Sequence, residues 1–132
     1  ISYLNLDDFC EKLTKFSLIT KNSKELRLSY CMKLQTILVL PPFLETLYVK
    51  YCSSLQTLPK LLLSLKTLDV GCCKSFQTLP ELPPFFETLD TEGYTFLQTL
   101  SELPPFLKTL YVQDYIGLQT LPELPHLTIL NA

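Results

Sequence analysis

Hydrophobic residues recur along this chain with a period of 21 residues, and polar residues fill the places between them. Successive units begin at Ser23, Leu44, Leu65, Phe86 and Leu107. Apolar residues take the same places in each unit, which in the unit starting at 44 are Leu44, Leu47, Val49, Cys52, Leu55, Leu58 and Leu61. A fixed period of this length predicts a solenoid, in which each unit forms one coil and stacks on the next.

These units set the expected organisation of the chain. Repeats span 1–22, 23–43, 44–64, 65–85, 86–106 and 107–126, and a partial repeat covers 127–132. The first repeat is the least regular, although Leu4 and Leu6 keep the spacing. Terminal repeats of solenoids usually form a polar cap, and neither end of this chain looks like one. We therefore expect a single solenoid segment, monomeric and cut from a longer array.

Each unit divides into a strand and a return segment. Leucine at the fourth place and leucine or valine at the sixth alternate with other residues, as in a strand with one buried face. We expect these short strands to stack in parallel along one side. Prolines recur in the return segments, at 41–42, 83–84 and 104–105, and they exclude an α-helix there. That side should be extended or polyproline-like, with little or no helix.

The opening pattern L-x-x-L-x-L, with Cys31, Cys52 and Cys73 at the ninth place, resembles the leucine-rich repeat. The resemblance implies an α/β-type leucine-rich-repeat solenoid, a horseshoe arc with its strands on the concave face. The phrase Tyr-Cys-Ser-Ser-Leu at 51–55 and the recurring Leu-Pro-x-Leu-Pro are similar to the C-terminal repeats of plant intracellular disease-resistance receptors, which combine TIR, nucleotide-binding and leucine-rich-repeat domains. Such receptors use the repeats to sense pathogen proteins in innate immunity and to restrain the nucleotide-binding switch. A cytoplasmic, or nuclear, location is therefore implied.

Two other interpretations stay open. Secreted bacterial effectors of the E3-ligase type share Leu-Pro-x-Leu-Pro before each strand and recognise substrates through their repeats. Such a ligase needs a catalytic cysteine in a separate domain, whereas all five cysteines of this chain lie within the repeats. The third interpretation is a plain scaffold protein. Tyr94 and Tyr115 stand at the cysteine place of their units and depart from the receptor pattern.

Composition narrows the possible functions. The chain is 47% hydrophobic and 18% charged, with a net charge of −2 and a pI near 5.3, which gives no basis for binding nucleic acid or an anionic membrane. No apolar run approaches the roughly 20 residues of a bilayer span. His126 is the single histidine, and no nucleophile with a nearby base or phosphate-binding loop can be assembled. We expect neither an enzyme nor a cofactor.

The cysteines point to structure instead of metal binding. Five is an odd number, and three recur at one place in the repeat, unlike the spacing of a disulfide framework. A cysteine column with one histidine in the chain does not supply a tetrahedral ligand set. We expect Cys31, Cys52 and Cys73 to be buried free thiols in a reducing compartment, and Cys72 to be accessible.

The fifth, seventh and eighth places change chemistry from coil to coil while the rest of the unit repeats. They should face outward from the strands, and they hold the candidate protein-binding residues Arg27, Tyr30, Tyr48, Lys50, Tyr51, Asp69, Asp90, Glu92, Tyr111 and Gln113. Tyrosine and arginine are typical interface anchors. We expect an aromatic and basic patch beside a separate acidic patch, and a protein partner on this face.

Three further columns predict structural roles. The second place alternates in charge, through Lys24, Glu45, Lys66, Glu87 and Lys108, and neighbouring coils should therefore form weak ion pairs that set the register. Glutamine-threonine pairs recur from Gln35 onward and predict a ladder of side-chain amides. Phenylalanines at the last place of three units, Phe43, Phe85 and Phe106, should fill the core between return segments.

Overall fold

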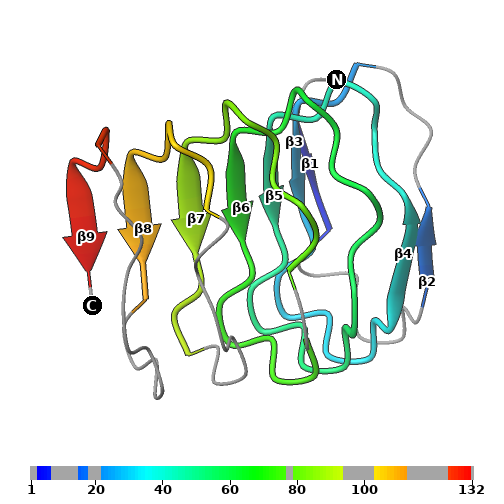
Figure 1. Cartoon of the computed structure of the whole chain (residues 1–132). Coiled ribbons are helices and arrows are strands. Elements are labelled where there is room, and N and C mark those ends of the chain that lie inside the picture. Colours follow the sequence, from blue (N-terminus) through cyan, green and yellow to red (C-terminus); the bar gives the residue numbers. More distant parts are fainter. Residues whose placement is uncertain are drawn as a thin grey trace.

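The computed structural model describes residues 3–6, 15–17, 22–76, 79–93, 103–112 and 125–131. These residues form a parallel β-solenoid in which most of the strands lie side by side along one wall, while β2 and β4 form a separate sheet (Figure 1). The strands are β1 (Tyr3–Asn5), β2 (Lys15–Ser17), β3 (Glu25–Arg27), β4 (Thr36–Val39), β5 (Thr46–Tyr48), β6 (Thr67–Asp69), β7 (Thr88–Asp90), β8 (Thr109–Tyr111) and β9 (Ile129–Asn131). The described residues contain no helix, and so none that could cross a membrane. This architecture is compatible with a leucine-rich-repeat-like solenoid.

The main sheet confirms the predicted stack of parallel strands. It has seven strands in the order β1-β3-β5-β6-β7-β8-β9. Equivalent places of adjacent coils pair with each other, since Leu26 aligns with Leu47 and Leu47 with Leu68. Adjacent strands therefore lie ~4.8 Å apart with every outward side chain in register.

Alternation of burial explains why these segments form strands. In β3, β5, β6, β7 and β8 the central leucine is buried and its two neighbours are partly exposed. Leu26, Leu47 and Leu68 are fully buried, and burying a leucine side chain stabilises the fold by about 2 kcal/mol. A one-residue slip would turn these side chains to solvent, so the register is strongly specified.

A second, two-stranded parallel sheet lies on the return side and was not predicted. It pairs β2 with β4, and an isolated bridge from Thr36 to Thr57 extends it by one coil. Residues 36–39 read Thr-Ile-Leu-Val, a β-branched run without proline, which favours a strand. In the unit that follows, Pro59 comes two residues after Thr57, and proline cannot donate to a ladder.

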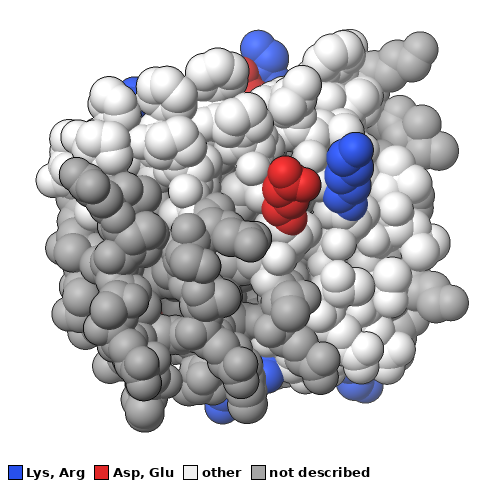
Figure 2. Space-filling model, viewed as in Figure 1, with Lys and Arg blue, Asp and Glu red and all other residues white. Residues whose placement is uncertain are grey.

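The other described return segments are extended and contain no helix, as predicted, and each ends in a turn. In the return segment of the unit that starts at 44, Leu55, Leu58 and Leu61 are buried in the core, whereas Leu62 and Leu63 are exposed. A turn then leads the chain back to the next strand, and the amide of Leu44 donates to the carbonyl of Pro41 at 3.2 Å to close one such turn. In the described part of the face toward the viewer, Figure 2 shows a red and a blue side chain next to each other among white ones.

The prediction that Phe43, Phe85 and Phe106 fill the core is wrong. Their exposed fractions are 62%, 65% and 42%. Each occupies the third place of a four-residue turn whose second place is proline, and the closing hydrogen bond of the turn around Phe85 joins Phe86 to Pro83 at 3.1 Å. Because the tip of such a turn faces away from the coil, its side chain extends into solvent. The repeat period fixed the phase of these residues without indicating their direction.

The cysteine column is partly as expected. Cys52 and Cys73 are buried free thiols, and each donates from Sγ to the carbonyl one coil earlier, of Leu28 and Val49 respectively, at 3.0 Å. Burial raises the pKa of Cys73 to about 12, so this thiol stays protonated and inert. Cys31, by contrast, is disulfide-bonded. It is therefore not the free thiol that was expected, and one of the three cysteines from which a reducing compartment was inferred does not support it.

The polar columns form less completely than expected. In the alternating-charge column, Lys108 and Glu87 form an ion pair at 3.3 Å. Among the described residues, Lys24, Glu45 and Lys66 form no such pair with one another. Gln35 and Gln56 are exposed, and the contact that joins them is a backbone hydrogen bond of 3.4 Å, not a side-chain ladder. Tyr94, Tyr115 and the later glutamines lie outside the described residues.

Candidate binding surface

Five of the predicted binding residues form one row across the outer face of the main sheet. The register aligns Arg27 with Tyr48, Tyr48 with Asp69, Asp69 with Asp90, and Asp90 with Tyr111. Each is the last residue of its strand and is partly exposed. The sheet therefore holds these side chains at fixed spacings of ~4.8 Å.

At one end of the row an arginine covers a tyrosine. The guanidinium carbon of Arg27 lies 4.7 Å from the centre of the Tyr48 ring, within the range of a cation–π contact, which contributes about 0.5 to 1 kcal/mol at an exposed site. The contact orders both side chains. Arg27 is half-buried, and its Nε atom is buried.

A second aromatic pair lies where the strands end. The rings of Tyr30 and Tyr51 stack with their centres 5.0 Å apart and an angle of 11° between their planes, and both side chains are exposed, by 56% and 36%. The ammonium of Lys50 lies 5.6 Å from the centre of the Tyr51 ring. These three side chains extend the row of Arg27 and Tyr48 into a broader aromatic and basic area.

The backbone beneath this second pair is strained. Tyr30, Tyr51 and Cys72 have φ angles of 65°, 60° and 56°, in the left-handed region, where a β-carbon costs roughly 1 to 2 kcal/mol. Gly93 takes the same place in the next coil with φ of 71° and avoids this cost. A turn requires the conformation: the amide of Cys52 donates to the carbonyl of Val49 at 3.2 Å around Tyr51.

Carboxylates occupy the middle of the row. Asp69 lies directly opposite Asp90, and the two accept backbone hydrogen bonds at 2.9 and 3.0 Å, from Gly71 and Glu92. Burial, together with the charge of Asp90, raises the pKa of Asp69 to about 6, although the Gly71 hydrogen bond and Lys50 act in the opposite direction. The row thus contains a carboxylate that titrates nearer to neutrality than usual.

The basic and acidic groups border each other and form one continuous surface. Burial lowers the pKa of Lys50, but the nearby charges, Asp69 and Asp90 foremost, outweigh it and raise the pKa overall. A β-carbon added to Gly71 would lie 3.1 Å from Oδ1 of Asp69 and 3.5 Å from Cε of Lys50. Because Gly71 has no side chain, Lys50 and the carboxylate of Asp69 can approach each other above it.

The structure brings nine predicted residues together as what we call the outer strip: Arg27, Tyr30, Tyr48, Lys50, Tyr51, Asp69, Asp90, Glu92 and Tyr111. Gln113 lies outside the described residues. Sequence reasoning missed the role of Cys72, whose side-chain hydrogen bond is the main cause that raises the pKa of Tyr51. The signal available was its position, eighth in its unit like Tyr30 and Tyr51.

The side chains of the outer strip are suited to binding a partner and do not form a metal or catalytic cluster. Within the described residues, no three His, Cys, Asp or Glu side chains gather in a way that could hold a metal ion. His126 stacks on Phe106 at 5.2 Å, in the turn that precedes β9, away from the strip. No protein-family model, curated protein or solved structure matches this chain.

Proposed function

We propose that this chain is a protein-recognition module that binds its partner through the outer strip. The observation that carries the proposal is the strained backbone at Tyr30 and Tyr51. Glycine would satisfy that turn without strain, as Gly93 does, yet two coils carry exposed, stacked tyrosines there. Strain held at a bulky left-handed residue is typical of functional sites.

The chemistry of the outer strip favours a folded protein or an extended peptide as the partner. Tyrosines and an arginine provide large apolar area that is already ordered by stacking, and such residues dominate binding energy at protein interfaces. Lys50 lies among Asp69 and Asp90, so the strip is mixed in charge. A polyanion such as nucleic acid would meet repulsion from these carboxylates.

We further propose, from the repeat pattern, that the module is the ligand-sensing and regulatory part of a plant intracellular immune receptor. The support is the sequence resemblance of residues 51–55 and of the Leu-Pro-x-Leu-Pro segments. A reading frame that encodes a nucleotide-binding switch domain beside these repeats would support the role. A frame that encodes a ligase domain with a catalytic cysteine would assign the chain to the effector class instead.

A photo-crosslinking experiment tests recognition by the outer strip. A benzophenone amino acid is placed at Tyr48 in the strip, or at Lys60, which is exposed in a return segment and serves as the matched control. Each variant is expressed in the source cells, irradiated and analysed by mass spectrometry. We expect one discrete protein adduct from position 48 and none of that mass from position 60.

Specificity is checked by removing the neighbouring anchors. The position-48 crosslinker is combined with Tyr51→Ala and Arg27→Ala, and the adduct should then fall at least tenfold, because hot-spot residues act as a cluster. Equal yields from positions 48 and 60, or an adduct that survives both substitutions, would contradict the proposal.

A further inference from the structure

A second exposed row lies along the edge of the solenoid where the chain enters the strands. Its members are Phe43, Leu63, Phe85 and Phe106, with exposed fractions of 62%, 79%, 65% and 42%. They lie in the turns that precede β5, β6, β7 and β8, and these turns run along the upper edge of Figure 1. On the described part of that edge Figure 2 shows many white side chains, with blue and red ones at the top. We call this row the turn ridge; it is separate from the outer strip at the other ends of the strands.

Two rings of the turn ridge, those of Phe85 and Phe106, contact each other. Phe106 packs against Phe85 at a tilt of 35° with ring centres 5.4 Å apart, and it stacks on His126 with ring centres 5.2 Å apart. Ring centres at this spacing leave no room for another ring between Phe85 and Phe106. Phe85 itself stays 65% exposed.

One coil interrupts the row of phenylalanines. Ser64 stands at the tip where Phe43 and Phe85 stand in neighbouring coils, and its hydroxyl donates inward to the carbonyl of Leu44 at 2.8 Å. Two coils separate the flanking phenylalanines, a gap of ~10 Å. The ridge thus has a notch at Ser64, bordered by the exposed side chain of Leu63.

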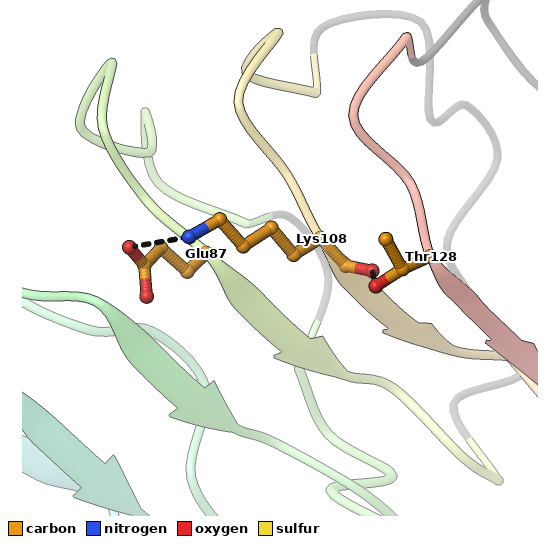
Figure 3. A network of polar contacts seen from close by, with 3 residues as sticks. All are labelled: Glu87, Lys108 and Thr128. Carbon is orange, nitrogen blue, oxygen red and sulfur yellow. Dashed lines mark hydrogen bonds and ion pairs between the residues drawn. The ribbon is translucent and has the colours of Figure 1, made fainter.

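The alternating-charge column runs beside the turn ridge, two residues further along each coil. It reads Lys24, Glu45, Lys66, Glu87 and Lys108. Figure 3 shows how the column lies across adjacent strands: Lys108 reaches Glu87 at 3.3 Å, and Thr128 of the next coil donates to the carbonyl of Lys108 at 3.1 Å. An alternating column is complementary to itself when it runs antiparallel with an offset of one coil.

We propose that the turn ridge pairs with the turn ridge of a second copy of this chain, antiparallel and offset by one coil. The two-fold axis then passes between the turns of Ser64 and Phe85, and Phe85 of each copy fills the notch at Ser64 of the other. The same offset places Lys66 opposite the partner copy's Glu87. In the symmetric register without the offset, Lys66 would face itself and Glu45 would face Glu87, which is repulsive.

The size of the ridge predicts a weak dimer. Its four apolar side chains expose roughly 500 Å² per copy, given ~200 Å² for each such side chain. The total of about 1,000 Å² is at the low end of specific interfaces, so the dissociation constant should be micromolar to millimolar. A membrane is a poorer occupant, because the adjoining column has charges of both signs and gains nothing from anionic lipid.

Analytical ultracentrifugation of the 132-residue chain tests this pairing. The wild type should show a monomer–dimer equilibrium between about 10 µM and 1 mM, and Phe85→Ser should weaken it at least tenfold. Met32→Ser is the matched control, because Met32 is apolar and 53% exposed but lies in a turn that follows a strand, off the ridge. Non-reducing electrophoresis confirms that the dimer is not covalent.

A charge exchange tests the register independently of the apolar contact. Lys66→Glu or Glu87→Lys alone should weaken association, and the double variant should recover it, since the offset register restores opposite charges between copies. A wild type that stays monomeric at 1 mM would overturn the proposal. So would Phe85→Ser that dimerises as the wild type does, a double variant that fails to recover, or a ridge that binds phosphatidylcholine vesicles as a monomer.

Discussion

Substitutions of Tyr51 test the claim that this tyrosine is held in a strained backbone. In most positions glycine is less stable than alanine by about 0.5 to 1 kcal/mol, because it loses more conformational freedom on folding. At a φ of 60° the β-carbon of alanine carries a cost of roughly 1 to 2 kcal/mol that glycine avoids. The usual order should therefore reverse, and Tyr51→Gly should be more stable than Tyr51→Ala by about 1 kcal/mol.

Comparison with the wild type separates strain from stacking. Both substitutions remove the ring that stacks on Tyr30, a loss of about 0.5 to 1.5 kcal/mol. Tyr51→Ala keeps the left-handed strain, so its free energy of unfolding should be lower than that of the wild type by this lost stacking energy. Tyr51→Gly relieves the strain and should lie close to the wild type, while both variants lose the binding contact.

Urea unfolding at neutral pH, followed by circular dichroism, measures these differences as shifts of the midpoint at constant slope. The matched control is Tyr48, which lies in strand β5 and is not among the residues with positive φ. There Tyr48→Gly should be less stable than Tyr48→Ala. Equal stability of the two variants at position 51, or alanine above glycine, would refute the inference that the turn strains Tyr51.

Three further outcomes follow from the geometry. The pKa of Asp69 is raised to about 6, so the folded state holds the proton more tightly than the unfolded chain does, and the free energy of unfolding falls as pH rises from about 4 to 6. Asp69→Asn should therefore be more stable than the wild type at pH 7 by about 1 to 2 kcal/mol after solvent screening. An equal gain in stability at pH 4 would contradict this. Gly93→Ala should destabilise by at least about 2 kcal/mol in urea unfolding, because φ is positive and the new β-carbon would meet Cys72 Sγ at 2.6 Å; an unchanged midpoint would count against it. Thiol labelling of the native chain should modify Cys72 well before the buried Cys52 and Cys73, and equal rates for all three would disprove the burial difference.

The repeat made much of the fold predictable from sequence. Alternation around Leu26 and Leu47 predicted the parallel strands and their burial. With a two-residue period, only one strand register places all the apolar side chains on the buried face. The prolines gave the helix-free return side, because proline removes a donor that a helix needs. Places five, seven and eight of the unit also gave the members of the outer strip, because places that do not pack in the core are free to vary.

Other features could not be predicted because their determinants are not periodic. Phe43 repeats in phase with core residues, yet the turn that contains it directs its side chain outward. The positive φ at Tyr30 could not be predicted because the residue is not a glycine. The disulfide of Cys31 depends on which residues lie close together in the folded chain. The merging of Lys50 with the carboxylates required the small residue at Gly71, whose effect appears only when three coils stack.

Binding through the outer strip is tested most directly by calorimetric titration of the partner that crosslinks to position 48. Tyr48→Ala should lose at least about 2 kcal/mol of binding free energy, as expected of a central anchor. Gln56→Ala, an exposed residue of the return side, should bind with nearly unchanged affinity. Normal binding by Tyr48→Ala together with a loss in Gln56→Ala would contradict the assignment of the binding surface.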